Sequence, residues 1–72
     1  MQENNKDLEI LGKHVKELRK SRNLTLENLC NKNGLEPSTI ARIEKGLVEP
    51  KYLTLLKLAK AFGLKLKDLL DF

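Results

Sequence analysis

The sequence is poor in cysteine, histidine and aromatic residues, and it contains no tryptophan. Because Cys30 is the only cysteine, no disulfide can form within the chain, which fits the reducing cytosol. Aromatic residues make up only 4% of the chain, so a core must be built from leucine, isoleucine and valine. No apolar run approaches the roughly 18 residues of a membrane span, and the polar start MQENNKD is not a signal peptide. We therefore expect a cytoplasmic protein with no membrane partner.

The residues that build metal and acid–base sites are also scarce. His14 is the only histidine, and no group of paired carboxylates or cysteines accompanies it. A solvent-exposed position explains His14 more simply than catalysis does, and a small buried position between helices explains Cys30. Glycine-rich phosphate-binding loops are absent too. We therefore expect no enzyme activity, no metal and no cofactor.

Length and charge describe a small basic domain. The 72 residues suffice for one domain, which we place at residues 8–72, after a polar and flexible stretch at residues 1–7. Hydrophobic residues make up 40% and charged residues 33%, a balance typical of a soluble globular chain. Lysine and arginine total 14 against 10 acidic residues, giving a net charge of +4. This excess favours nucleic acid or another polyanion as partner.

Apolar residues at helical spacing predict an all-α fold of five helices. The first helix, at residues 8–21, carries an apolar stripe at i, i+4 and i+7: Leu11, Val15 and Leu18. Leucine-rich patterns predict a fourth helix at residues 51–62 and a short fifth helix at residues 66–70. The leucines of the fifth helix are expected to close the core.

The central stretch EPSTIARIEKG, residues 36–46, predicts a short third helix with two different edges. Pro37 suits the first helical turn, where its missing N–H would be unpaired anyway. Gly46 is placed to end the helix in the left-handed region. Ile40 and Ile43 would face the core, which leaves a small-polar and basic edge on the other side.

A second helix precedes this one at very short distance. Thr25 is a good N-cap for it, and the helix stops at Asn33 and Gly34. Only three or four residues then separate it from the third helix. This spacing indicates a helix-turn-helix at about residues 25–46.

Small or apolar residues fall at fixed offsets across the two central helices. Counted from Leu26 as the first, the fifth, ninth, fifteenth and eighteenth positions hold Cys30, Gly34, Ile40 and Ile43. With the flanking segments LGKHVKELRKSRNLTLENLC and LLKLAKAFGLKLKDLL, the pattern resembles the phage-repressor and Cro-like helix-turn-helix proteins, also called the Xre family. The resemblance runs from Leu11 to Leu70, and STIARIEKG followed by proline is its most specific part. It implies a compact five-helix, lambda-repressor-like DNA-binding domain.

The resemblance also implies which residues would meet DNA. In the family, the N-terminal part of the third helix touches base edges in the major groove. Here the matching residues are Pro37, Ser38, Thr39 and Arg42. Arg42 is the strongest candidate for base readout, because its guanidinium can bond guanine O6 and N7 together. The hydroxyls of Ser38 and Thr39 can reach bases or phosphates.

Further positions match the family's contacts to the DNA backbone. Backbone N–H groups at the start of the second helix could bind phosphate, and so could basic or polar residues after the third helix. These positions are Thr25, Leu26, Lys45, Lys51 and Tyr52. Arg19 and Glu44 match a family pair that joins the first and third helices, which we interpret as a structural brace that orients the third helix.

Three departures from the family pattern weaken the expected DNA contacts. Leu26 stands where many members carry a glutamine that reaches the DNA backbone. Glu36 stands where serine or threonine often starts the third helix; glutamate is a poorer N-cap and repels phosphate. Pro37 occupies a position that often offers a polar base contact. We therefore expect a narrower specificity than is usual in the family.

The sequence supports two hypotheses of different classes. The first is a repressor that binds a palindromic operator as a homodimer and excludes polymerase from the promoter. Its dimer interface would use apolar residues near the edge of the domain, unless these merely complete the small core: Leu47, Val48, Leu70 and Phe72. The second is an antitoxin-like module that neutralises a toxin-like protein partner and binds DNA only weakly.

Overall fold

Side-chain caps start the first two helices of the chain, at Asn5 and Thr25. The computed structural model describes residues 5–72, which contain five helices and no strand. This confirms the predicted all-α fold. The helices are α1 (Lys6–Ser21), α2 (Leu26–Cys30), α3 (Pro37–Glu44), α4 (Tyr52–Ala61) and α5 (Leu66–Leu69).

Helix α1 begins earlier than predicted. The side chain of Asn5 accepts hydrogen bonds from the backbone N–H groups of Asp7 and Leu8, at 2.9 and 3.2 Å. An asparagine in this role satisfies N–H groups that have no partner inside the helix, so α1 starts at Lys6. Of the stretch predicted to be flexible, residues 5–7 are therefore a cap and a first turn, and residues 1–4 lie outside the described residues.

Helix α2 ends at Cys30, three residues before the predicted stop at Asn33. The chain turns immediately afterwards, because Lys32 adopts a positive φ of 70°. The side-chain amide of Asn33 then donates to the backbone oxygen of Leu29 at 2.7 Å, which ties the turn to the end of α2. Gly34 follows with the positive φ of 67° expected at this turn.

One apolar core lies between the helices. Six side chains are essentially inaccessible: Val15, Leu29, Ile40, Ile43, Leu58 and Leu69. The core is mainly aliphatic, as the scarcity of aromatic residues predicts, and it includes one aromatic residue, Phe62. None of the helices within residues 5–72 is both long and apolar enough to cross a membrane.

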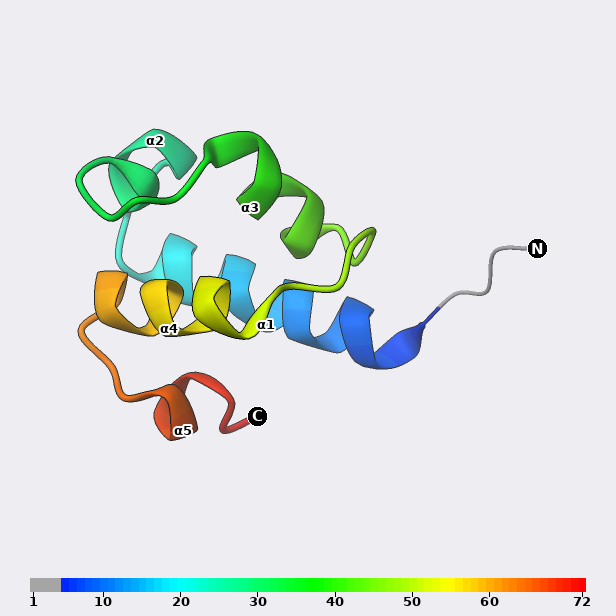
Figure 1. The fold of residues 1–72 in the computed structure, drawn as a ribbon. Coiled ribbons are helices and arrows are strands. Elements are labelled where there is room, and N and C mark those ends of the chain that lie inside the picture. Colours follow the sequence, from blue (N-terminus) through cyan, green and yellow to red (C-terminus); the bar gives the residue numbers. More distant parts are fainter. Residues whose placement is uncertain (1–4) are drawn as a thin grey trace.

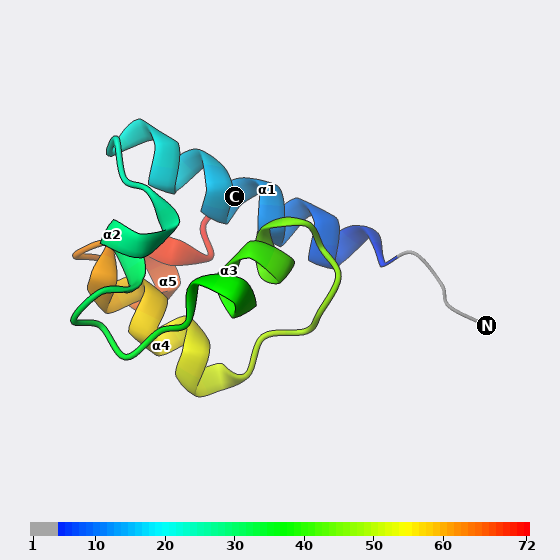
Figure 2. The same ribbon diagram turned by 90° about the horizontal axis from the view of Figure 1, so that it is seen from above.

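The helices form three levels in Figure 1. Helices α1 and α4 occupy the middle level, α2 and α3 lie on one side of them, and α5 lies on the other side. Seen from above in Figure 2, α3 therefore lies on the outer surface of the molecule. The C-terminus is on the side of α5, away from α3.

Candidate nucleic-acid interface

Helix α3 presents two different edges, as its sequence predicts. Ile40 and Ile43 are 0% and 1% exposed and anchor the helix on the core. The opposite edge is solvent-exposed, and its residues are Ser38, Thr39, Arg42 and Lys45, the last at the C-cap. Pro37 is the first helical residue and is partly buried. The structure thus brings the predicted base-reading residues onto one short helix whose outer edge is free of the core.

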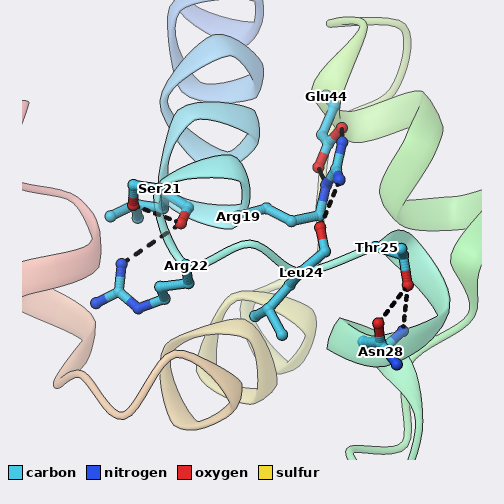
Figure 3. Close-up of polar contacts among 8 residues, drawn as sticks. Arg19, Ser21, Arg22, Leu24, Thr25, Asn28 and Glu44 are labelled. Atoms are coloured by element: carbon cyan, nitrogen blue, oxygen red, sulfur yellow. Dashed lines mark hydrogen bonds and ion pairs between the residues drawn. The ribbon is translucent and has the colours of Figure 1, made fainter.

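An ion pair between Arg19 and Glu44 joins α1 to α3 (Figure 3). Arg19 Nε donates to Glu44 Oε2 at 2.8 Å, and Arg19 Nη2 donates to Glu44 Oε1 at 3.1 Å. A third bond runs from Arg19 Nη1 to the backbone oxygen of Leu24 at 2.8 Å, so one guanidinium also holds the segment that leads to α2. The hydrogen bonds to Glu44 raise the pKa of Arg19 above its ordinary value. The segment before α2 and the end of α3 are therefore both tied to α1.

Gly12 supports the same contact between α1 and α3, although the apolar pattern of α1 does not point to it. A Cβ atom at this position would overlap the backbone oxygen of Ile43 and would lie 2.7 Å from the backbone oxygen of Glu44. Only a residue without a side chain lets α1 approach the end of α3 so closely. A glycine inside an amphipathic helix lowers helix stability by about 1 kcal/mol relative to alanine. A glycine at such a position therefore suggests a close packing contact, and this was the one sign of the contact in the sequence.

The predicted phosphate contacts lie at the start of α2 and between α3 and α4. Thr25 caps α2: its hydroxyl accepts from the N–H of Asn28 at 3.0 Å and donates to the Asn28 side chain at 2.8 Å. Its side chain is therefore occupied, which leaves backbone N–H groups for a phosphate. Leu26 packs partly against the core, so this departure from the family pattern has a structural role.

The residues after α3 frame an open hollow of about 360 Å³, here called the α3–α4 hollow. Its walls come from α3, from the loop that follows, and from the first turn of α4: Thr39, Arg42, Ile43, Val48, Glu49, Pro50, Lys51 and Thr54. Arg42 and Lys51, predicted separately for bases and phosphates, therefore share one depression. Tyr52 lies beside Lys51 in the chain and is exposed. Glu36 is exposed and makes no capping hydrogen bond to α3.

The four residues predicted for a dimer interface lie in two places. Leu47 and Val48 belong to the loop after α3, whereas Leu70 and Phe72 follow α5 near the other side of the molecule (Figure 1). Leu47 is 66% exposed and Phe72 is 56% exposed. The ring of Phe72 stacks on His14 with a centroid separation of 4.5 Å. His14 is thus partly buried beneath an aromatic ring, and the expectation of a simple surface residue was wrong.

Cys30 lies in the core, as predicted, with 3% of its surface exposed. Burial is the main reason why the pKa of its thiol is raised, and the carboxylate of Glu27 adds to the effect. The side chain therefore stays protonated at neutral pH and is a poor nucleophile. Within residues 5–72 no group of three or more histidine, cysteine or acidic side chains is placed to hold a metal ion.

Known proteins share both the sequence pattern and the fold. The family model described as helix-turn-helix matches residues 15–69. An uncharacterised HTH-type transcriptional regulator of Methanocaldococcus jannaschii is 42% identical over 55 residues, which is 76% of this chain and 83% of that protein. The uncharacterised HTH-type transcriptional regulator YgzD of Bacillus subtilis is 43% identical over 54 residues, covering 75% of this chain and 82% of the relative.

Two solved structures have the same arrangement of helices. The restriction-modification controller protein C.AhdI from Aeromonas hydrophila superposes with a TM-score of 0.85 at 31% identity, over 90% of this chain and 98% of the controller. The clp gene regulator ClgR from C. glutamicum gives a TM-score of 0.77 at 25% identity, over 88% of this chain and 82% of ClgR. The two relatives are named as transcriptional regulators, and the two solved structures as a controller protein and a gene regulator. The chain therefore belongs to the helix-turn-helix family, and α2 and α3 form the DNA-binding motif of a transcriptional regulator.

Proposed function

We propose that the protein is a repressor in the cytoplasm that binds a palindromic operator as a homodimer, with α3 in the major groove. The observation that carries this proposal is the exposed edge of α3. Ser38, Thr39 and Arg42 are displayed on a helix whose other edge is fixed by buried isoleucines and by the Arg19–Glu44 pair. Side chains that read base edges need this combination of exposure and fixed orientation.

Charge distribution supports the same proposal. Among residues 5–72, Arg19 and Glu44 form the one ion pair, so Arg42, Lys45 and Lys51 have no acidic side chain within 4.0 Å there. Phosphates are the natural partners of such cations, and each contact adds affinity that falls as salt rises. Because a single small domain offers few contacts, two copies on symmetric half-sites about 34 Å apart would supply the affinity and would cover promoter DNA.

The experiment that tests the proposal is selection of bound sequences from a random DNA pool at near-physiological salt. We expect enrichment of a palindrome whose half-sites are separated by about one helical turn. Enrichment of a single, non-repeated site would contradict the homodimer. No enrichment, together with weak and strongly salt-dependent binding, would contradict sequence-specific regulation and favour the protein-interaction alternative.

The composition of α3 argues against the protein-interaction alternative. The relatives described above are named as transcriptional regulators, and the exposed edge of α3 is cationic and hydroxyl-bearing rather than apolar. The core of a protein interface is depleted in charged residues, so a surface of this composition is better suited to binding DNA than to binding a protein.

A further inference from the structure

The loop after α3 carries one acidic residue, Glu49, which lines the α3–α4 hollow. In the segment Val48-Glu49-Pro50, the outer two residues are partly buried and Glu49 is exposed. A residue that precedes proline is restricted to extended backbone, which limits the directions in which Glu49 can point. Gly46, with a φ of 72°, ends α3 and sets the course of this loop. The carboxylate of Glu49 is therefore presented by a constrained backbone.

Glu49 lines the same hollow as Arg42, the strongest base-reading candidate. Arg42 and Glu49 both line it, one from α3 and the other from the loop. Their charged groups do not form an ion pair within 4.0 Å among the described residues. One hollow is thus lined by an exposed residue whose side chain is a pure donor, Arg42, and by an exposed residue whose carboxylate is a pure acceptor, Glu49.

A G·C base pair has the complementary arrangement on its major-groove edge. Guanine presents the acceptors O6 and N7, and the cytosine amino group N4 lies next to O6 as a donor. We propose that Glu49 is a second specificity-determining residue, whose carboxylate accepts a hydrogen bond from the N4 amino group of the cytosine paired to the guanine that Arg42 contacts. This inference rests on the proposed function, because it requires α3 to lie in the major groove.

The opposing explanation is simple repulsion. If Glu49 faced only the DNA backbone, its charge would weaken binding to every sequence alike. A base contact instead changes the preference at one position of the site. These two effects can be separated, because one changes overall affinity and the other changes a ratio of affinities.

The test is selection from a random DNA pool with four proteins: the wild type, Glu49→Ala, Glu49→Gln and Arg42→Ala. We expect the wild type to select G·C at one position of each half-site. Arg42→Ala and Glu49→Ala should each lower the preference for G·C by roughly tenfold, at that same position. Glu49→Gln, which keeps an acceptor oxygen and the side-chain shape, should fall between wild type and Glu49→Ala.

Glu17→Ala is the matched control. It makes the same change in net charge, and Glu17 is exposed on α1, in a separate hollow with Ile10, His14 and Phe72. Its base preferences should equal those of the wild type. Equal strengthening of all sequences by Glu49→Ala would overturn the inference, as would a change at a position that Arg42 does not affect. If the wild type enriches no sequence, the proposed function itself fails, which is a distinct result from an unaltered preference in Glu49→Ala.

Discussion

Arg42 and Lys45 lie on the same helix edge but suit different contacts. The guanidinium of Arg42 is a rigid fork that matches guanine, whereas the ammonium of Lys45 is a point charge suited to phosphate. Lys45 is the C-cap of α3, so its side chain leaves the helix at the end farther from Pro37. The pair therefore allows base readout and backbone attraction to be measured separately.

Arg42→Ala should lower affinity for the selected site by ~1–3 kcal/mol and relax the preference at one base pair. Lys45→Ala should weaken all sequences alike and reduce the slope of log affinity against log salt by about 1. A gel-shift series over several salt concentrations, with the selected site and single-base variants, measures both effects. If Arg42→Ala changes neither affinity nor preference, its assignment to base readout is wrong.

We expect Cys30 to make the free energy of unfolding depend on pH at alkaline pH. Since burial raises the pKa of its thiol, the folded protein holds the thiol proton more tightly than the unfolded chain does. This contribution to the free energy of unfolding is complete below pH ~8.5 and is lost as pH rises through the folded pKa. Cys30→Ala should remove that part of the decline. Urea unfolding of both proteins between neutral and alkaline pH measures it, and a constant difference between the curves would contradict it.

At the scale of elements, the position of α3 depends on its contact with α1. Two different interactions hold this contact: the close packing of the α1 backbone at Gly12 against α3, and the bidentate ion pair of Arg19 with Glu44. Both are long-range contacts that hold the end of a helix with only eight residues. A helix this short is not stable alone, so its orientation is set by these contacts and by Ile40 and Ile43.

Gly12→Ala should destabilise the protein by about 1–3 kcal/mol, although alanine is the better helix former by about 1 kcal/mol. The added methyl group would meet backbone oxygens of α3, which cannot move as a flexible side chain would. Lys13→Ala, at the exposed neighbouring position, should change stability by less than about 0.5 kcal/mol. Denaturant unfolding compares the two, and a Gly12→Ala protein as stable as the wild type would disprove the close approach.

Removal of one partner of the Arg19–Glu44 pair should be severe. Their side chains are 13% and 5% exposed, so Arg19→Ala leaves a nearly buried carboxylate without its partner. The expected loss is ~3–5 kcal/mol, comparable with the whole stability of a small domain. Replacing both residues, as Arg19→Met with Glu44→Leu, should recover most of that loss. Thermal unfolding followed by circular dichroism measures the set, and a double variant no better than Arg19→Ala would contradict the explanation.

At the scale of the whole molecule, apolar surface remains uncovered. Besides Leu47 and Phe72, the side chains of Ile10, Tyr52 and Leu53 are more than half exposed. Isolated apolar side chains are common on protein surfaces, but they also supply the core of a dimer interface. With a mass of 8.2 kDa, this chain would gain much stability from burying such residues against a second copy.

We expect sedimentation equilibrium to show a mass of about twice that of the monomer at micromolar concentrations, since two-fold dimers are the commonest oligomers. Replacing Phe72 or Leu47 with glutamate places a charge in the predicted interface and should shift the equilibrium toward monomer. The substitution that shifts the equilibrium shows which of the two places, the loop after α3 or the segment after α5, forms the interface. Wild-type protein that sediments as a monomer at all concentrations would contradict the dimer.

Much of the fold could be predicted from local patterns. The apolar spacing located all five helices, Thr25 was correctly placed as an N-cap, and Gly34 and Gly46 have the positive φ values expected of them. Boundaries were less accurate. The start of α1 depends on Asn5, and the early end of α2 depends on the turn at Lys32 and Asn33, which apolar spacing does not report.

The sequence by itself determined the helices and the two-edged character of α3, because both depend on residues a few positions apart. The tertiary structure decided the rest. It showed that Gly12 is needed for the approach of α1 to α3, that Phe72 covers His14, and that Glu49 shares a hollow with Arg42. These facts depend on which segments, distant in the sequence, come together in the folded chain. Helical periodicity reports only on residues a few positions apart, so it does not show which charged side chains remain free to contact a partner.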